Sequence, residues 1–118
     1  MPNRGKRARY GFGPDRRLSR RGDFERLLRH GKRRSIAGYA FFLQRREEGP
    51  PRLGILISRR HAAKATERNG IKRCIREAFR LEQSRLEGID VLVRPPYGIR
   101  ASAAMLASVR ALLCKLAS

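Results

Sequence analysis

The sequence predicts an α+β fold, in which helices pack on one β-sheet as a two-layer α/β sandwich. Its 118 residues are enough for one domain with a single modest core. Apolar residues recur at helical spacing in three segments and follow strand-like patterns in three others. Along the chain these segments run helix, strand, strand, long helix, strand, helix, and no internal repeat is visible.

The first helix is predicted at residues 20–30. Phe24, Leu27 and Leu28 fall on one side of it, at the spacing of an apolar helical stripe. Gly31 follows directly and is a common residue at the end of a helix.

Two strands are predicted next, at residues 38–45 and 52–58. The first is rich in aromatic residues, and the second places Leu53, Ile55 and Ile57 on one face. Because the loop between them is short, we expect the two strands to pair as an antiparallel hairpin.

A long amphipathic helix is predicted at residues 63–83 and is the most informative segment. Its apolar arc consists of Ile71, Cys74, Ile75, Ala78 and Phe79. Its neighbouring arc consists of Arg68, Asn69, Lys72, Arg73, Arg76 and Arg80. A helix buried on one side holds such positive charges at fixed positions, which predicts a surface that binds a polyanion.

A third main strand is predicted at residues 89–94, and the last helix at 101–116. Asp90 lies inside that strand, where we expect it to make structural hydrogen bonds. The apolar seam of the last helix consists of Met105, Val109, Leu112 and Leu116.

The charge balance points to a polyphosphate partner. The 29 basic and 10 acidic side chains give a net charge of +19, which attracts nucleic acid. Residues 1–17 mix Arg, Gly and Pro without periodicity, which predicts a basic arm that is disordered when free, followed by a domain at 18–118. A membrane surface would also attract this charge. However, no apolar run reaches the ~20 residues of a membrane span, and no signal peptide is visible, so we expect a cytoplasmic protein.

Residue patterns for catalysis or metal binding are absent from the sequence. Ser58 and His61 are close in sequence, but nothing orients them as nucleophile and base. Phosphate-binding glycine motifs are also missing. Cys74 and Cys114 lie far apart in apolar helical positions, which favours two reduced core thiols over a zinc site. We therefore expect no active site and no metal site in this chain.

The segment ERNGIKRCIREAFR, residues 67–80, resembles the Arg-rich helix of the bacterial ribonuclease P protein family, whose pattern is RN-R-IKR-L-I/L-RE-F. The matching residues are Arg68, Asn69, Ile71, Lys72, Arg73, Ile75, Arg76, Glu77 and Phe79. Gly70 departs from the pattern, because the family has a second Arg there. The resemblance continues in the same order over roughly residues 17–116.

This resemblance implies the fold, the partners and the site residues. The implied fold is αβββαβα with a left-handed βαβ crossover, whereas the general rule favours a right-handed one. The implied role is the protein subunit of an endoribonuclease whose large RNA removes the 5′ leader from precursor tRNA, with magnesium ions held mainly by the RNA and no obligate protein partner. Residues implied to contact ribonuclease P RNA are Arg59, Arg60, Lys64, Arg68, Asn69, Lys72, Arg73 and Arg76. Phe24, Leu28 and Phe42 match positions that line a cleft for the leader, and ordinary core packing is their alternative role.

A different class of function also fits the composition: a small basic ribosomal or ribosome-assembly protein with no enzymatic partner. A nucleoid protein that binds DNA would have similar charge, but no zinc finger, aromatic RNA-binding pair or zipper-linked basic region is present. The ordered match to the Arg-rich helix and the aromatic cleft positions favour the ribonuclease P subunit.

Overall fold

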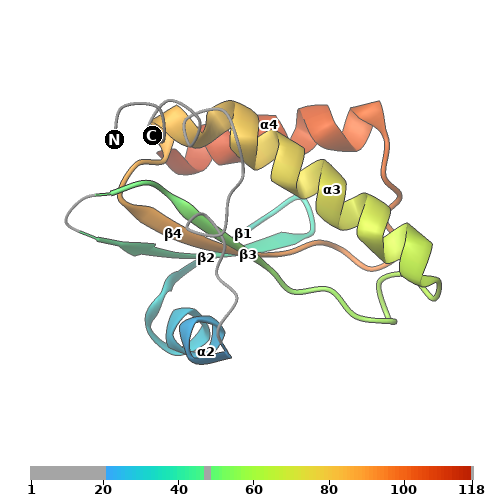
Figure 1. Ribbon diagram of the computed structural model, residues 1–118, viewed down its shortest axis with the longest axis horizontal. Coiled ribbons are helices and arrows are strands. Elements are labelled where there is room, and N and C mark those ends of the chain that lie inside the picture. Colours follow the sequence, from blue (N-terminus) through green and yellow to red (C-terminus); the bar gives the residue numbers. More distant parts are fainter. Residues whose placement is uncertain (1–20, 47–48, 118) are drawn as a thin grey trace, which may run out of the picture.

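The computed structural model describes residues 21–46 and 49–117, which form one four-stranded sheet with helices on both faces (Figure 1). In chain order the elements are α2 (Arg21–His30), β1 (Lys32–Ile36), β2 (Tyr39–Arg45), β3 (Arg52–Ile55), α3 (Ala65–Glu82), the short 3-10 helix η2 (Gln83–Arg85), β4 (Ile89–Arg94) and α4 (Ala103–Ala117). The α+β class is confirmed. The arm predicted at residues 1–17 lies outside the described residues. Within the described ranges, no helix combines the length and apolar character needed to cross a membrane.

The strand order is β1-β2-β4-β3. β4 pairs antiparallel with β2 and parallel with β3, so it separates the two strands that the sequence predicted as a hairpin. The predicted pairing of β2 with β3 is therefore wrong. The physical reason lies in β4. Its residues 89–93 are all buried, whichever face of the sheet their side chains point to, and such a strand suits a central place between two neighbours. The hand of the β3–α3–β4 crossover stays a prediction.

Strand β1 has no counterpart in the apolar pattern of the sequence. Its residues, KRRSI, are exposed or half-buried at the edge of the sheet, so they show no alternation of buried apolar side chains. A tight turn pairs it with β2, since Ile36 lies opposite Tyr39. Ala37 and Gly38 between them have φ angles of 54° and 85°, the left-handed conformation of a two-residue hairpin turn.

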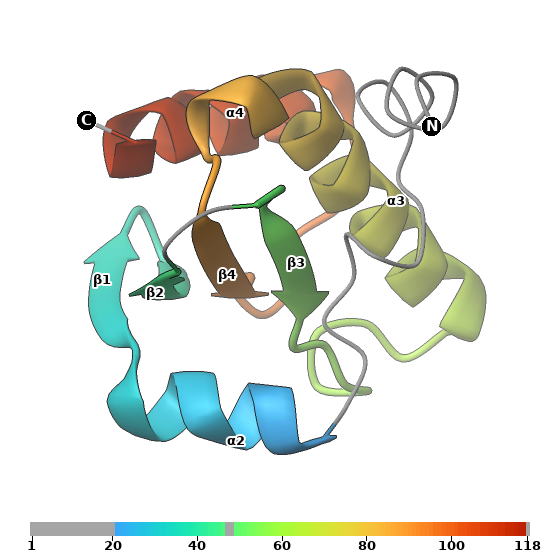
Figure 2. The same cartoon turned by 60° about the vertical axis from the view of Figure 1, so that its left-hand side comes forward.

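Two apolar clusters lie on opposite faces of the sheet. The larger one joins the sheet to α3 and α4, and the smaller one joins it to α2. Figure 2 shows α2 crossing one side of the sheet while α3 and α4 cover the other. In the smaller cluster Leu27 of α2 is fully buried against Ala40, Phe42 and Leu92.

The predicted helices are confirmed with small shifts at their ends. The first begins at Arg21, the long helix spans Ala65–Glu82, and the last spans Ala103–Ala117. The predicted seam of the last helix is buried: Met105, Val109, Leu112 and Leu116. The second predicted strand is shorter than expected and ends at Ile55.

Candidate nucleic-acid interface

Helix α3 is fixed to the rest of the molecule by its apolar side. Ile71, Ile75, Ala78 and Phe79 are buried in the larger cluster, as the sequence predicted, and Cys74 packs at its edge. Burying an aliphatic or aromatic side chain contributes about 1.5–3 kcal/mol. This side therefore fixes the direction in which the polar side of α3 faces.

The predicted RNA-binding side chains fall into an exposed and a half-buried set. The exposed residues are Arg59, Arg60, Lys64, Asn69 and Arg73. The half-buried residues are Arg68, Lys72 and Arg76. All eight belong to α3 or to the connection that leads into it from β3. We call these eight side chains the α3 basic surface.

Arg68 also has a structural contact that the sequence did not predict. Its Nη1 donates hydrogen bonds to the carbonyl oxygens of Ala62 and Ala63, both at 2.9 Å. These bonds tie the connection before α3 to the second turn of the helix. Arg68 therefore helps to position Arg59 and Arg60, and only part of its guanidinium remains for a ligand.

His61 fixes the same connection from the other side, a role that no sequence pattern indicated. Its Nδ1 accepts the backbone N–H of Ser58 at 3.0 Å, so its Nε2 carries the proton and donates to the Pro95 carbonyl at 3.0 Å. The Ser58 hydroxyl lies 3.4 Å from Nδ1. Because both ring nitrogens already have backbone partners, the approach of Ser58 to His61 serves structure.

The three residues predicted to contact the leader differ in exposure. Phe24 is half-buried, Leu28 is 45% exposed and Phe42 is 6% exposed. The Arg33 guanidinium lies 5.7 Å from the centre of the Phe42 ring, within the range of a cation–π contact. Phe42 is thus mainly a core residue beneath Arg33, whereas Leu28 offers an apolar side chain to a ligand. We call the region formed by Phe24, Leu28, Phe42 and Arg33 the α2–sheet surface.

Asp90 anchors the α2–sheet surface and is fully buried. Its carboxylate lies 2.9 Å from Arg26 Nη2, 2.9 Å from Arg46 Nε and 2.8 Å from Arg52 Nη2. These ion pairs connect α2, the residue after β2 and the start of β3 to the central strand, which confirms the structural role expected for Asp90. Hydrogen bonds to Asp90 raise the pKa of the Arg52 guanidinium above its ordinary value.

Both cysteines are free and half-buried. Burial raises the pKa of Cys74, and a hydrogen bond from its thiol to the Glu82 carboxylate at 3.2 Å raises the pKa of Cys114. Raised pKa values keep thiols protonated near neutral pH and slow their reactions. The described residues contain no group of three or more His, Cys, Asp or Glu placed to hold a metal ion.

Gly70 lies inside α3 without a positive φ, and a Cβ built there meets only the Cβ of Ala101, at 3.5 Å. We predict that Gly70→Ala raises the free energy of unfolding by about 0.5–1 kcal/mol, because glycine costs that much in a helix relative to alanine. Urea denaturation measures this change. Gly38→Ala is the control and should destabilise, since Gly38 has a φ of 85°. A loss of stability in Gly70→Ala would contradict the prediction.

Comparison with known proteins agrees with this geometry. The sequence profile of the family described as Ribonuclease P matches residues 12–117. A ribonuclease P protein component from Nitrosococcus oceani is 38% identical over 90 residues, which cover 76% of each chain. The ribonuclease P protein from Thermotoga maritima superimposes with a TM-score of 0.67 at 28% identity, covering 85% of this chain and 93% of that one. The Staphylococcus aureus protein gives a TM-score of 0.69 at 25% identity, covering 83% and 88%.

Proposed function

This chain belongs to the ribonuclease P protein family, and we propose that it binds ribonuclease P RNA through the α3 basic surface. In this role it assists the RNA in removing the 5′ leader from precursor tRNA. One observation carries the proposal: α3 is rigidly fixed by a buried apolar side while its cationic side chains face outward. The family match does not favour the alternative role in the ribosome or its assembly.

The α3 basic surface suits contact with the RNA backbone. RNA duplexes have a deep, narrow major groove that side chains cannot read, so proteins recognise their phosphates, hydroxyls and shape. Arginine fits phosphate well, because its planar guanidinium can donate two parallel hydrogen bonds. Fixed positions for these donors reduce the entropy lost on binding.

We assign the chemical step and its magnesium ions to the RNA. The support comes from the state of the buried carboxylates, since Asp90 and Glu82 are both paired with arginines. Glu82 lies 2.7 Å from Arg110 Nε, and Asp90 has its three arginine partners. The protein then acts by positioning the substrate and by compensating phosphate charge.

The α2–sheet surface is the proposed contact for the single-stranded leader. It combines the exposed Leu28 and the half-buried Phe24 with the exposed cation Arg33, which lies over the Phe42 ring. Apolar side chains next to cations suit single strands of varied sequence, because stacking tolerates any base and contributes about 1–3 kcal/mol per base.

Leu28→Ala tests this contact. Shortening the leader should lower the affinity of the unmodified complex for its precursor. In the variant this fall should be about fivefold smaller, since the variant already lacks an apolar contact of about 1 kcal/mol. Its affinity for ribonuclease P RNA should not change. The measurement is the affinity of the assembled complex for precursors with long and short leaders.

Leu81→Ala is the matched control, because Leu81 is a similarly exposed leucine, at 39%, on α3. It should keep the full dependence on leader length. An identical dependence on leader length in both variants would contradict the proposal that the leader contacts the α2–sheet surface. Phe42→Ala is a poor test, since truncating a buried Phe costs about 3–5 kcal/mol of stability.

The function itself is tested by multiple-turnover cleavage of precursor tRNA. We expect the protein alone to cleave nothing, and the RNA alone to need high magnesium. Adding the protein should lower the magnesium requirement and favour precursor over mature tRNA. Absence of stimulation at low magnesium would contradict the proposed function.

A further inference from the structure

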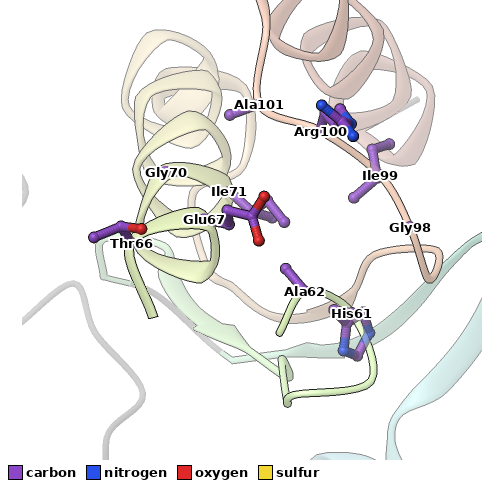
Figure 3. A pocket seen from close by; sticks show the side chains of 10 residues that line it. All are labelled: His61, Ala62, Thr66, Glu67, Gly70, Ile71, Gly98, Ile99, Arg100 and Ala101. Carbon is purple, nitrogen blue, oxygen red and sulfur yellow. The ribbon is translucent and has the colours of Figure 1, made fainter. Parts of the chain in front are cut away.

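A cavity of about 410 Å³ lies between the first turns of α3 and the connection from β4 to α4 (Figure 3). Its walls come from three segments: residues 61–62, residues 66–71 and residues 98–101. The volume falls within the range of about 300–1,000 Å³ that is typical of small-ligand pockets. We call this cavity the α3–α4 pocket.

The α3–α4 pocket has an apolar floor. Ile71 is 1% exposed, and Ala62 and Ile99 are half-buried beside it. Gly70 has no side chain to occupy the space. A flat aromatic ring of modest size therefore fits such a site better than a bulky or highly charged group.

One acidic side chain enters the α3–α4 pocket. Figure 3 shows the Glu67 carboxylate extending from α3 toward Ile99. Among the residues that the structure describes, its carboxylate accepts one hydrogen bond, a long one of 3.4 Å from the backbone N–H of Lys64 to Oε1. A carboxylate only accepts hydrogen bonds, so the remaining sites on Glu67 suit a ligand that offers N–H donors.

The surroundings of the α3–α4 pocket are cationic and aromatic. Arg100 is exposed and lines the wall opposite Glu67. Tyr97 is 59% exposed, and its ring lies edge-on to His61 with centroids 4.6 Å apart. Because His61 is fixed by two backbone partners, Tyr97 is supported at a defined place beside the pocket.

We propose that the α3–α4 pocket binds one unpaired guanine nucleotide of the RNA partner. The base lies over the apolar floor with its Watson–Crick edge at Glu67, and Arg100 contacts its phosphate. This inference rests on the proposed function, since it takes the α3 basic surface to lie against RNA. It adds base recognition on the side of α3 that faces the connection to α4, separate from the residues of the α3 basic surface.

The preference for guanine follows from the pattern of donors. Guanine presents two adjacent donors, N1–H and N2–H, which match the two oxygens of a carboxylate. Adenine and cytosine place a ring acceptor beside their amino group, and uracil flanks its single N–H with two carbonyl groups. Each of these would bring an acceptor against Glu67 and leave it partly unpaired, which is costly in a binding site.

The test measures binding of the full chain to four eight-nucleotide RNAs at low salt. The RNAs are oligouridine strands that differ only at a central position, which is G, A, C or U. We expect the strand with G to bind at least about fivefold more tightly than the others, the low end of discrimination by a bidentate contact. Equal affinity for all four strands would overturn the proposal.

Glu67→Gln gives the sharpest variant, because charge and base recognition predict opposite results. Removing a negative charge near RNA should strengthen binding to every strand by electrostatics alone. Loss of the guanine contact should instead weaken binding to the G strand and abolish its advantage. Glu87→Gln is the control, since Glu87 is an exposed glutamate beyond the other end of α3, and it should keep the guanine preference.

Gly70→Leu fills the α3–α4 pocket without any change of charge and should also abolish the preference. If that variant fails to fold, as judged by thermal unfolding, the guanine preference of Glu67→Gln still tests the proposal. A guanine preference that survives Glu67→Gln would overturn the proposal. Stimulation of precursor cleavage without any guanine preference would overturn this inference alone, whereas a protein that binds no RNA overturns the proposed function as well.

Discussion

Asp90→Asn is expected to lower the free energy of unfolding by about 2–3 kcal/mol, because it leaves three guanidinium groups without their common carboxylate. Removing one partner of a fully buried ion pair costs about 3–5 kcal/mol. The three arginine side chains are partly exposed, at 36% for Arg26, 27% for Arg46 and 29% for Arg52. Solvent therefore screens part of the repulsion that remains among their guanidinium groups. We therefore place the loss below that range.

Asp23→Asn is the matched control for this prediction. Asp23 also pairs with Arg26, at 3.1 Å, but its side chain is 21% exposed and has one arginine partner within the described residues. Its loss should cost less than about 1 kcal/mol, as for ordinary exposed ion pairs. Urea denaturation of both variants gives the two values. A similar small loss for Asp90→Asn would show that the arginine cluster does not anchor α2 to the sheet.

The second large effect concerns RNA binding. We predict that the double variant Lys72→Ala/Arg73→Ala reduces the salt dependence of RNA affinity by about 1.4–1.8 in log–log slope, since each phosphate contact contributes about 0.7–0.9. Affinity should fall by at least about tenfold, because hydrogen bonds to charged groups contribute about 1.5–3 kcal/mol each. Titrations of ribonuclease P RNA at several salt concentrations measure both quantities.

Lys72 and Arg73 are chosen because the structure gives them no ion pair within the described part of the chain. By contrast, Arg68 also holds the carbonyl groups of Ala62 and Ala63, so its removal would mix structural and binding effects. The control Arg45→Ala/Lys115→Ala removes two exposed cations from β2 and α4, outside the α3 basic surface. An equal change in slope for both double variants would show that the effect depends on net charge and not on the α3 basic surface.

Periodicity predicted the elements that carry one buried face. Ile71, Ile75 and Phe79 recur at helical spacing, and β4 has an apolar run, so α3 and β4 were visible in the sequence. Strand β1 was not, because an exposed basic edge strand has no such pattern. The pairing of β3 with β4 depends on contacts distant in sequence, and a short loop gave the wrong partner.

The candidate site shows a similar division. The sequence indicated which cations accompany α3, because their spacing and the family pattern coincide. It did not indicate that His61 fixes the connection before α3, or that the Arg33 guanidinium lies over the Phe42 ring. These roles depend on partners in other elements, which local spacing cannot reveal.

Photocrosslinking tests the central claim, contact between the α3 basic surface and ribonuclease P RNA, most directly. A photoreactive amino acid in place of Asn69, which is exposed on α3, should crosslink to the RNA in the assembled complex. The same group in place of Lys115, exposed on α4, should give little or no crosslink. Strong crosslinking from position 115 and none from position 69 would contradict the claim.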